Sequence, residues 1–114
     1  MNTVEHRRSQ RLLLDVPVIV RGESARQQSF QEETFTIVVS AHGALVVLAA
    51  KVALGQRLLL TNPKTGDERE GRVASLGSPY GGLTQVGIAF TRPAPEFWPL
   101  SPVPDAWKTD PSGS

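Results

Sequence analysis

Three arginines stand within five positions near the start of the chain, in the stretch RRSQR, and no acidic residue lies between them. Arg7, Arg8 and Arg11 have planar guanidinium groups, each of which can hold a phosphate or the O6/N7 edge of guanine through two bonds at once. The RxxxR spacing of Arg7 and Arg11 lets a loop present two such groups to one compact ligand. Taken alone, the cluster predicts either a local anion site or a solvated N-terminal arm.

Catalytic and metal chemistry find little support elsewhere. The chain has no cysteine, and its two histidines, His6 and His42, lack a neighbouring acid at a spacing that would make a metal site. Ser40 lies two residues before His42, but no third group is placed to orient such a pair. The glycine-rich GSPYGG lacks the lysine and the strand-to-helix context of a phosphate loop and predicts a hairpin. We therefore expect no enzyme activity, no metal and no catalytic cofactor.

Composition limits the partners and the cellular location that can be expected for the protein. Twelve Lys and Arg against eleven Asp and Glu give a formal charge of +1, which is too balanced for binding long nucleic acid over the whole surface. No apolar run is long enough for a membrane span, and the N-terminus lacks the pattern of a signal peptide. Without cysteine the fold must rely on packing alone. The sequence predicts a cytoplasmic protein without a membrane partner.

The arginines precede a series of short β-rich segments that must position them. Alternating apolar residues or β-rich composition, bounded by Gly, Pro and Asn turns, predict six strands. They fall in residues 15–22, 30–40, 44–50, 54–62, 67–77 and 84–90. No amphipathic stretch is long enough for a substantial helix. We expect an all-β fold, a small six-stranded antiparallel barrel, because closure removes exposed strand edges.

Within residues 30–40, strict alternation predicts which side chains face the ligand side of the barrel. Phe35, Ile37 and Val39 are expected on one face. The other face, expected to point outward, carries Thr34, Thr36, Val38 and Ser40. Gly43 follows in the turn SAHG, where a positive φ is expected.

The composition changes at Pro93, and from Pro93 onward the chain holds six of its nine prolines and both tryptophans. Repeated proline leaves room only for a short turn or helix at PEFW and favours extended chain beyond it. Trp98 is a large apolar surface, so we expect Phe97 and Trp98 to fold back onto the barrel.

The expected organisation is therefore one folded domain with two appendages. Residues 1–11 form a flexible basic arm and residues 12–98 form the barrel. Residues 99–114 form a Pro-rich tail, partly disordered, particularly in its last residues.

The chain resembles the PilZ domain over about residues 5–98. The resemblance rests on four segments in a fixed order: RxxxR, the strand DVPVIV, the segment VVSAHGALV and the final strand VGIAF. That family has a two-part signature, RxxxR followed by (D/N)xSxxG. The resemblance implies a bacterial six-stranded barrel of the split-barrel type that binds cyclic di-GMP as a second-messenger receptor or adaptor. It implies that the arginines grip the ligand while the second motif forms a floor on the outer face of the barrel. The residues carried over to a cyclic di-GMP site are Arg7, Arg8, Arg11, Val38, Ser40 and Gly43.

Val38 departs from the family pattern, because the signature has Asp or Asn there, which bonds to a guanine edge. The first alternative is that the arginines still hold cyclic di-GMP while Val38 packs on a base. The second is that the domain no longer binds the ligand and presents an apolar surface to an unidentified protein partner. The third is that Val38 lies buried under residues 96–98. A single-stranded nucleic-acid binder would need more aromatic residues on the strand face than the barrel offers.

Overall fold

The computed structural model describes residues 11–23 and 28–100. Within these residues the chain forms seven strands and one short 3-10 helix. The strands are β1 (Leu12–Leu13), β2 (Pro17–Glu23), β3 (Ser29–Ser40), β4 (Gly43–Leu48), β5 (Arg57–Thr61), β6 (Glu68–Leu76) and β7 (Thr84–Phe90), and the 3-10 helix is η2 (Pro95–Phe97). No helix in this part of the chain has the length and apolarity needed to cross a bilayer.

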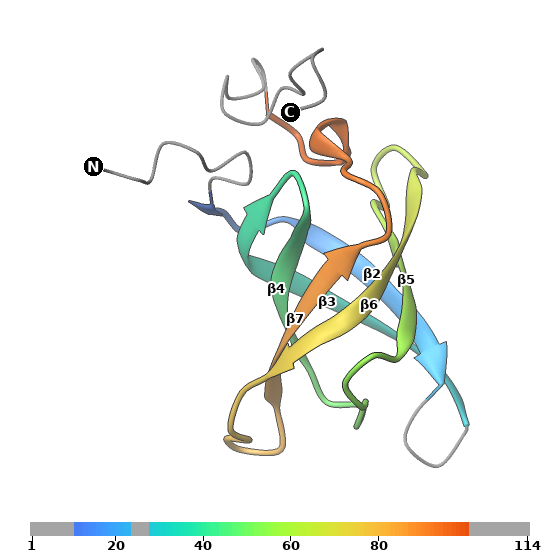
Figure 1. Cartoon of the computed structure of the whole chain (residues 1–114), viewed down its shortest axis with the longest axis vertical. Helices are drawn as coiled ribbons and strands as arrows, with labels where there is room; N and C mark the ends of the chain where they lie inside the picture. The colour runs from blue at the N-terminus through green and yellow to red at the C-terminus, as the bar shows by residue number, and fades with distance from the viewer. Residues whose placement is uncertain (1–10, 24–27, 101–114) are drawn as a thin grey trace.

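Six of the strands close into a barrel (Figure 1). The antiparallel order β3-β2-β5-β6-β7-β4 is closed by pairing of β3 with β4. β1 is an additional short strand. It pairs with Val38 and Val39 near the end of β3, whereas β2 pairs with residues 29–35 of β3. The predicted six-stranded antiparallel barrel is confirmed, and β1 is a seventh strand that the sequence pattern did not predict.

The core follows the two-residue period of the strands. Alternate residues of β2 and β7 point inward, as the sequence predicted. The buried valine, leucine and isoleucine side chains come from β2, β3, β4, β5, β6 and β7, so the barrel interior is filled by side chains. The largest of these inward residues are Leu48, Leu58, Leu60 and Ile88.

The faces of β3 differ from the predicted ones over its first part. Thr36 is buried at 1% exposure, whereas Phe35 is 58% exposed. The register to β4 shifts between Thr36 and Val38, so one extra residue is inserted and the alternation changes phase. Beyond this bulge Val39 points inward. The prediction for Phe35, Thr34 and Thr36 was wrong because a run of β-branched residues does not reveal a bulge.

The segment after β7 covers one end of the barrel, where η2 (orange) lies in Figure 1. Phe97 and Trp98 are 1% and 2% exposed, which confirms the expected return of this segment. Their rings contact Phe90, with centroid separations of 5.6 Å for Phe97 and 5.8 Å for Trp98. Residues 1–10 of the predicted arm (1–11) and residues 101–114 of the predicted tail (99–114) lie outside the described residues, so the predicted domain boundaries remain predictions.

Candidate ligand-binding site

Arg11 is positioned by the strand that follows it. Leu12 pairs with Val39 and Leu13 with Val38, in antiparallel register. Continuing this register by one residue places Arg11 at the level of Ser40. The pairing of β1 with β3 therefore brings the end of the RxxxR segment to the segment VVSAHG.

Thr36 fixes the chain that leads out of β1. Its buried hydroxyl donates to the carbonyl oxygen of Leu14 at 2.6 Å and accepts from the backbone N–H of Val16 at 2.9 Å. The carbonyl of Leu14 and the N–H of Val16, in the crossing between β1 and β2, thus both have a hydrogen-bond partner inside the protein. A threonine at this inward position ties the N-terminal segment to β3.

The turn between β3 and β4 is shaped by its own residues. The Ser40 hydroxyl oxygen accepts from the backbone N–H of His42 at 3.1 Å, which closes a local side-chain turn. Gly43 has φ of +155°, and a Cβ there would lie 1.9 Å from the carbonyl oxygen of Ile88. Gly43 is needed because β7 passes too close for any side chain.

The same turn is held from beneath by the C-terminal segment. The indole Nε1 of Trp98 donates to the carbonyl oxygen of Ser40 at 2.7 Å. The backbone N–H of Ala94 donates to the carbonyl oxygen of Ala41 at 2.8 Å. These bonds join the turn to the segment that closes the barrel.

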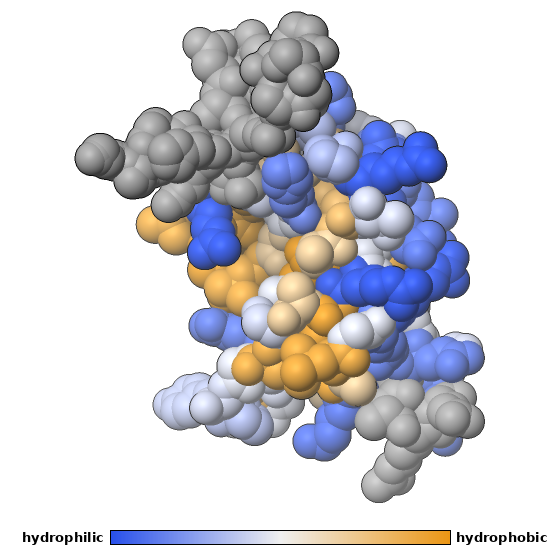
Figure 2. Space-filling model, in the orientation of Figure 1, coloured by the Kyte–Doolittle hydropathy of each residue, from blue (hydrophilic) through white to orange (hydrophobic). Residues whose placement is uncertain are grey.

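Beside this turn, a hollow of about 320 Å³ lies on the outer surface of the barrel, over the end of β3 and the strands β4, β6 and β7. Its size falls at the small end of the range of ligand sites. Small side chains make its floor, and they include Ala44, Ala74, Ser75, Gly87 and Ala89. Figure 2 views the side of the barrel on which β4, β7 and β6 lie in front, and shows apolar surface along the β4 side facing hydrophilic side chains on the β5 side.

Gly87 has no side chain to fill the hollow at the bulge between β6 and β7. The register there shifts between Val73 and Ser75, and Gly87 pairs with Ser75. A Cβ on Gly87 would lie 2.2 Å from the Ser75 hydroxyl oxygen. A larger residue would have to displace Ser75 and would fill the hollow.

The charge of the hollow has one sign. Among the residues that line it, Arg11 and His42 alone carry ionisable side chains, and no acid is present. Across the described residues, no group of three or more His, Cys, Asp or Glu could hold a metal ion. The arrangement suits a flat, anionic ligand better than a metal.

The structure brings together four of the six predicted site residues. Arg11, Val38, Ser40 and Gly43 all line the hollow, and Val38 is half-buried on β3. Arg7 and Arg8 lie outside the described residues. The prediction missed the floor on β6 and β7. Its signal was present as small residues at the outward positions of two alternating strands, Ala74, Gly87 and Ala89.

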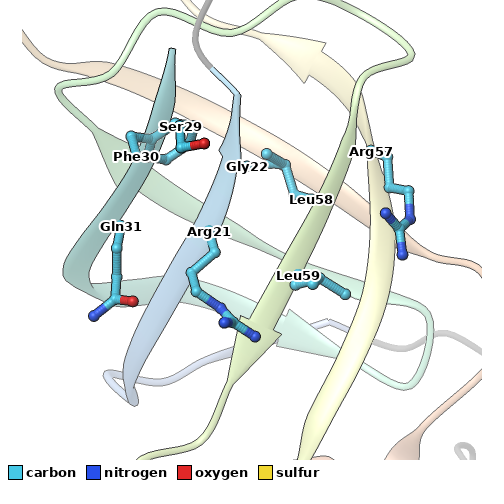
Figure 3. A pocket seen from close by; sticks show the side chains of 8 residues that line it. All are labelled: Arg21, Gly22, Ser29, Phe30, Gln31, Arg57, Leu58 and Leu59. Carbon is cyan, nitrogen blue, oxygen red and sulfur yellow. The ribbon is translucent and has the colours of Figure 1, made fainter. Parts of the chain in front are cut away.

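A second hollow of about 440 Å³ lies at β2, β3 and β5 (Figure 3). It is the larger of the two, and Arg21 and Arg57 are on its wall. Both cations are already paired, Arg21 with Glu68 and Arg57 with Glu70, where the nitrogen–oxygen distance is 3.0 Å. This hollow therefore offers an anion less uncompensated charge than the hollow at Arg11.

The comparisons with known proteins agree with the fold. The model of the PilZ domain family matches residues 5–97. The match covers most of the chain, and the chain belongs to the PilZ domain family.

One solved structure gives a measure of the likeness. The structure of Bacillus subtilis Inhibitor of motility (MotI/DgrA) matches with a TM-score of 0.55 and 21% identity. The match covers 75% of this chain and 43% of that chain, so the chain spans less than half of that protein's length. At this identity the likeness concerns the fold alone. No curated protein gives a significant match.

Proposed function

We propose that this PilZ domain is a non-enzymatic receptor or adaptor that binds cyclic di-GMP in the hollow at Arg11. The observation that carries the proposal is the pairing of β1 with β3, which puts Arg11 beside the turn at Ser40 and Gly43. The last residue of RxxxR thereby lies beside the second motif, at a surface whose lining among the described residues includes no acid. Arg7 and Arg8 precede this point in the chain and are proposed as further anion contacts.

The chemistry of the hollow suits the two parts of the ligand. Cyclic di-GMP has two phosphates, which guanidinium groups bind through charge-assisted hydrogen bonds. It also has two flat guanine bases, for which a floor of Ala44, Ala74 and Ala89 offers a low apolar surface. Val38 lies in the same hollow and can pack on a base, where the family's Asp or Asn would form hydrogen bonds. The missing bonds lower the expected affinity by about tenfold to a hundredfold.

Calorimetric titration with cyclic di-GMP tests the proposal. The wild type is expected to bind saturably below about 100 µM. The variant Arg7→Ala/Arg11→Ala is expected to bind at least about tenfold more weakly for each charge-assisted contact that is lost.

The matched control is Arg21→Ala/Arg57→Ala, which removes the same charge from the other hollow. It is expected to bind like the wild type. Equal losses in both double variants would show a general charge effect, and no saturation in the wild type would reject the receptor function.

A second candidate function is favoured by the apolar character of the hollow. Val38, which stands where the family signature has Asp or Asn, lines it together with Leu45. On this alternative, the domain is a degenerate PilZ domain that does not bind cyclic di-GMP and contacts an unidentified protein partner.

The substitution Val38→Asp separates the two functions. If the wild-type domain does not bind cyclic di-GMP, Val38→Asp is expected to create binding that the wild type lacks. If the wild type binds and Val38→Asp weakens the complex, the valine is part of a working site. Titration of both proteins under the same conditions gives the answer.

A further inference from the structure

His42 is fixed at the mouth of the hollow by its backbone rather than by its side chain. Its N–H donates to the Ser40 hydroxyl oxygen at 3.1 Å, and its carbonyl oxygen accepts from the N–H of Phe90 at 2.8 Å. The residue is exposed, so ordering its imidazole on a ligand need not disrupt the core. The turn thus holds an imidazole beside the hollow, and in hydrogen bonds among the described residues His42 takes part only through its backbone.

The charged surroundings of His42 favour an anion. Arg11 reaches the same hollow from the β1 side, and β4, β6 and β7 contribute uncharged residues to it. The segment after β7 carries Arg92 and Glu96, and neither lines the hollow. A phosphate held between Arg11 and His42 would meet two donors and, among the described residues that line the hollow, no acid.

We infer that, in the cyclic di-GMP site proposed above, His42 in its protonated form is a second phosphate ligand beside Arg11. An imidazole changes charge between about pH 5 and 8, whereas a guanidinium and a phosphodiester keep theirs. Phosphate binding stabilises the imidazolium, so the complex takes up a proton when it forms near neutral pH. The affinity for cyclic di-GMP is therefore highest at low pH and falls as pH rises and the imidazolium of the complex loses its proton.

The test is calorimetric titration of the full chain with cyclic di-GMP at several values between about pH 5.5 and 8. The wild type is expected to bind about threefold to tenfold more tightly at the low end. At neutral pH its apparent binding enthalpy is expected to change with the ionisation enthalpy of the buffer, which reports proton uptake.

Three variants assign the effect. His42→Gln keeps a hydrogen-bond donor without a titrating charge and is expected to flatten the pH dependence. His42→Arg carries a charge that does not titrate, and it is expected to keep the tight binding at high pH. His6→Gln changes the other histidine of the chain and is expected to retain the pH dependence.

The outcomes separate the role of His42 from the receptor function. A wild type that binds with no pH dependence overturns the role of His42 and leaves the receptor function standing. The role of His42 is also overturned if the pH dependence survives in His42→Gln or disappears in His6→Gln. A wild type that does not bind at any pH overturns both. Circular dichroism of each variant confirms that the barrel is folded.

Discussion

Two residues of the β3–β4 turn, Ser40 and Gly43, set the conformation of its backbone. Ser40 is 8% exposed and uses its hydroxyl to close the turn, and Gly43 allows β7 to pass. The resemblance to the PilZ signature predicted ligand contacts at both positions, whereas the contacts that Ser40 and Gly43 make in the structure are internal. Arg11, Val38 and His42 also line the hollow, and theirs are the side chains that we propose to contact the ligand.

Replacing Gly43 by alanine is expected to destabilise the fold by about 3 kcal/mol or more. The new Cβ would collide with the backbone of Ile88, which cannot rotate away. Chemical denaturation measures the loss. Gly81→Ala is the matched control, because Gly81 has a φ of +62° but no atom within 4 Å of an added Cβ. Its expected cost is about 1 to 2 kcal/mol, and an equal cost at both sites would contradict the clash.

At the scale of elements, two connections position the candidate site. β1 pairs with β3 and so positions Arg11, the residue before it, while the segment after β7 holds the turn through Trp98. Neither connection is visible as a strand or helix pattern. The run LLL lacks alternation, and the PEFW segment contacts the turn across 58 positions of sequence separation.

The substitution Thr36→Val tests the first connection. It keeps the side-chain shape and leaves the carbonyl of Leu14 and the N–H of Val16 without their partner, at a cost of about 1 to 3 kcal/mol. Because this crossing follows β1, binding of cyclic di-GMP is expected to weaken as well. The exposed Thr91→Val serves as the control in denaturation and titration. Unchanged stability in Thr36→Val would show that the crossing does not depend on this hydroxyl.

The substitution Trp98→Phe tests the second connection. It retains an aromatic ring against Phe90 and removes the donor to the Ser40 carbonyl, so a loss of about 1 to 3 kcal/mol is expected. Thermal or chemical unfolding measures it. Tyr80→Phe, at a residue that is 88% exposed, should stay within about 0.5 kcal/mol of the wild type. Similar values for the two variants would argue against a structural role for the indole N–H.

At the scale of the whole molecule, the barrel could be predicted because β2 and β7 alternate and because Gly, Pro and Asn turns bound the other β-rich segments. Val86, Ile88 and Phe90 point inward as their spacing indicated. The hidden features are bulges and long-range contacts: the bulge at Ile37 reverses the faces of β3, and the bulge opposite Gly87 shapes the floor. A bulge depends on the partner strand, which local sequence does not specify. The motif half at Arg11 and the half at Ser40 could be foreseen, but the floor from β6 and β7 required the closed barrel.

The central claim is that cyclic di-GMP lies in the hollow over the end of β3 and strands β4, β6 and β7. Its most direct test is an NMR titration of the isotopically labelled protein with cyclic di-GMP, which reports every backbone amide separately. We predict that the shifts concentrate at the amides of residues 38–45, 74–75 and 87–89. Shifts concentrated instead at residues 21–22, 29–31 and 57–59 of the second hollow, or no shifts at all, would contradict the account.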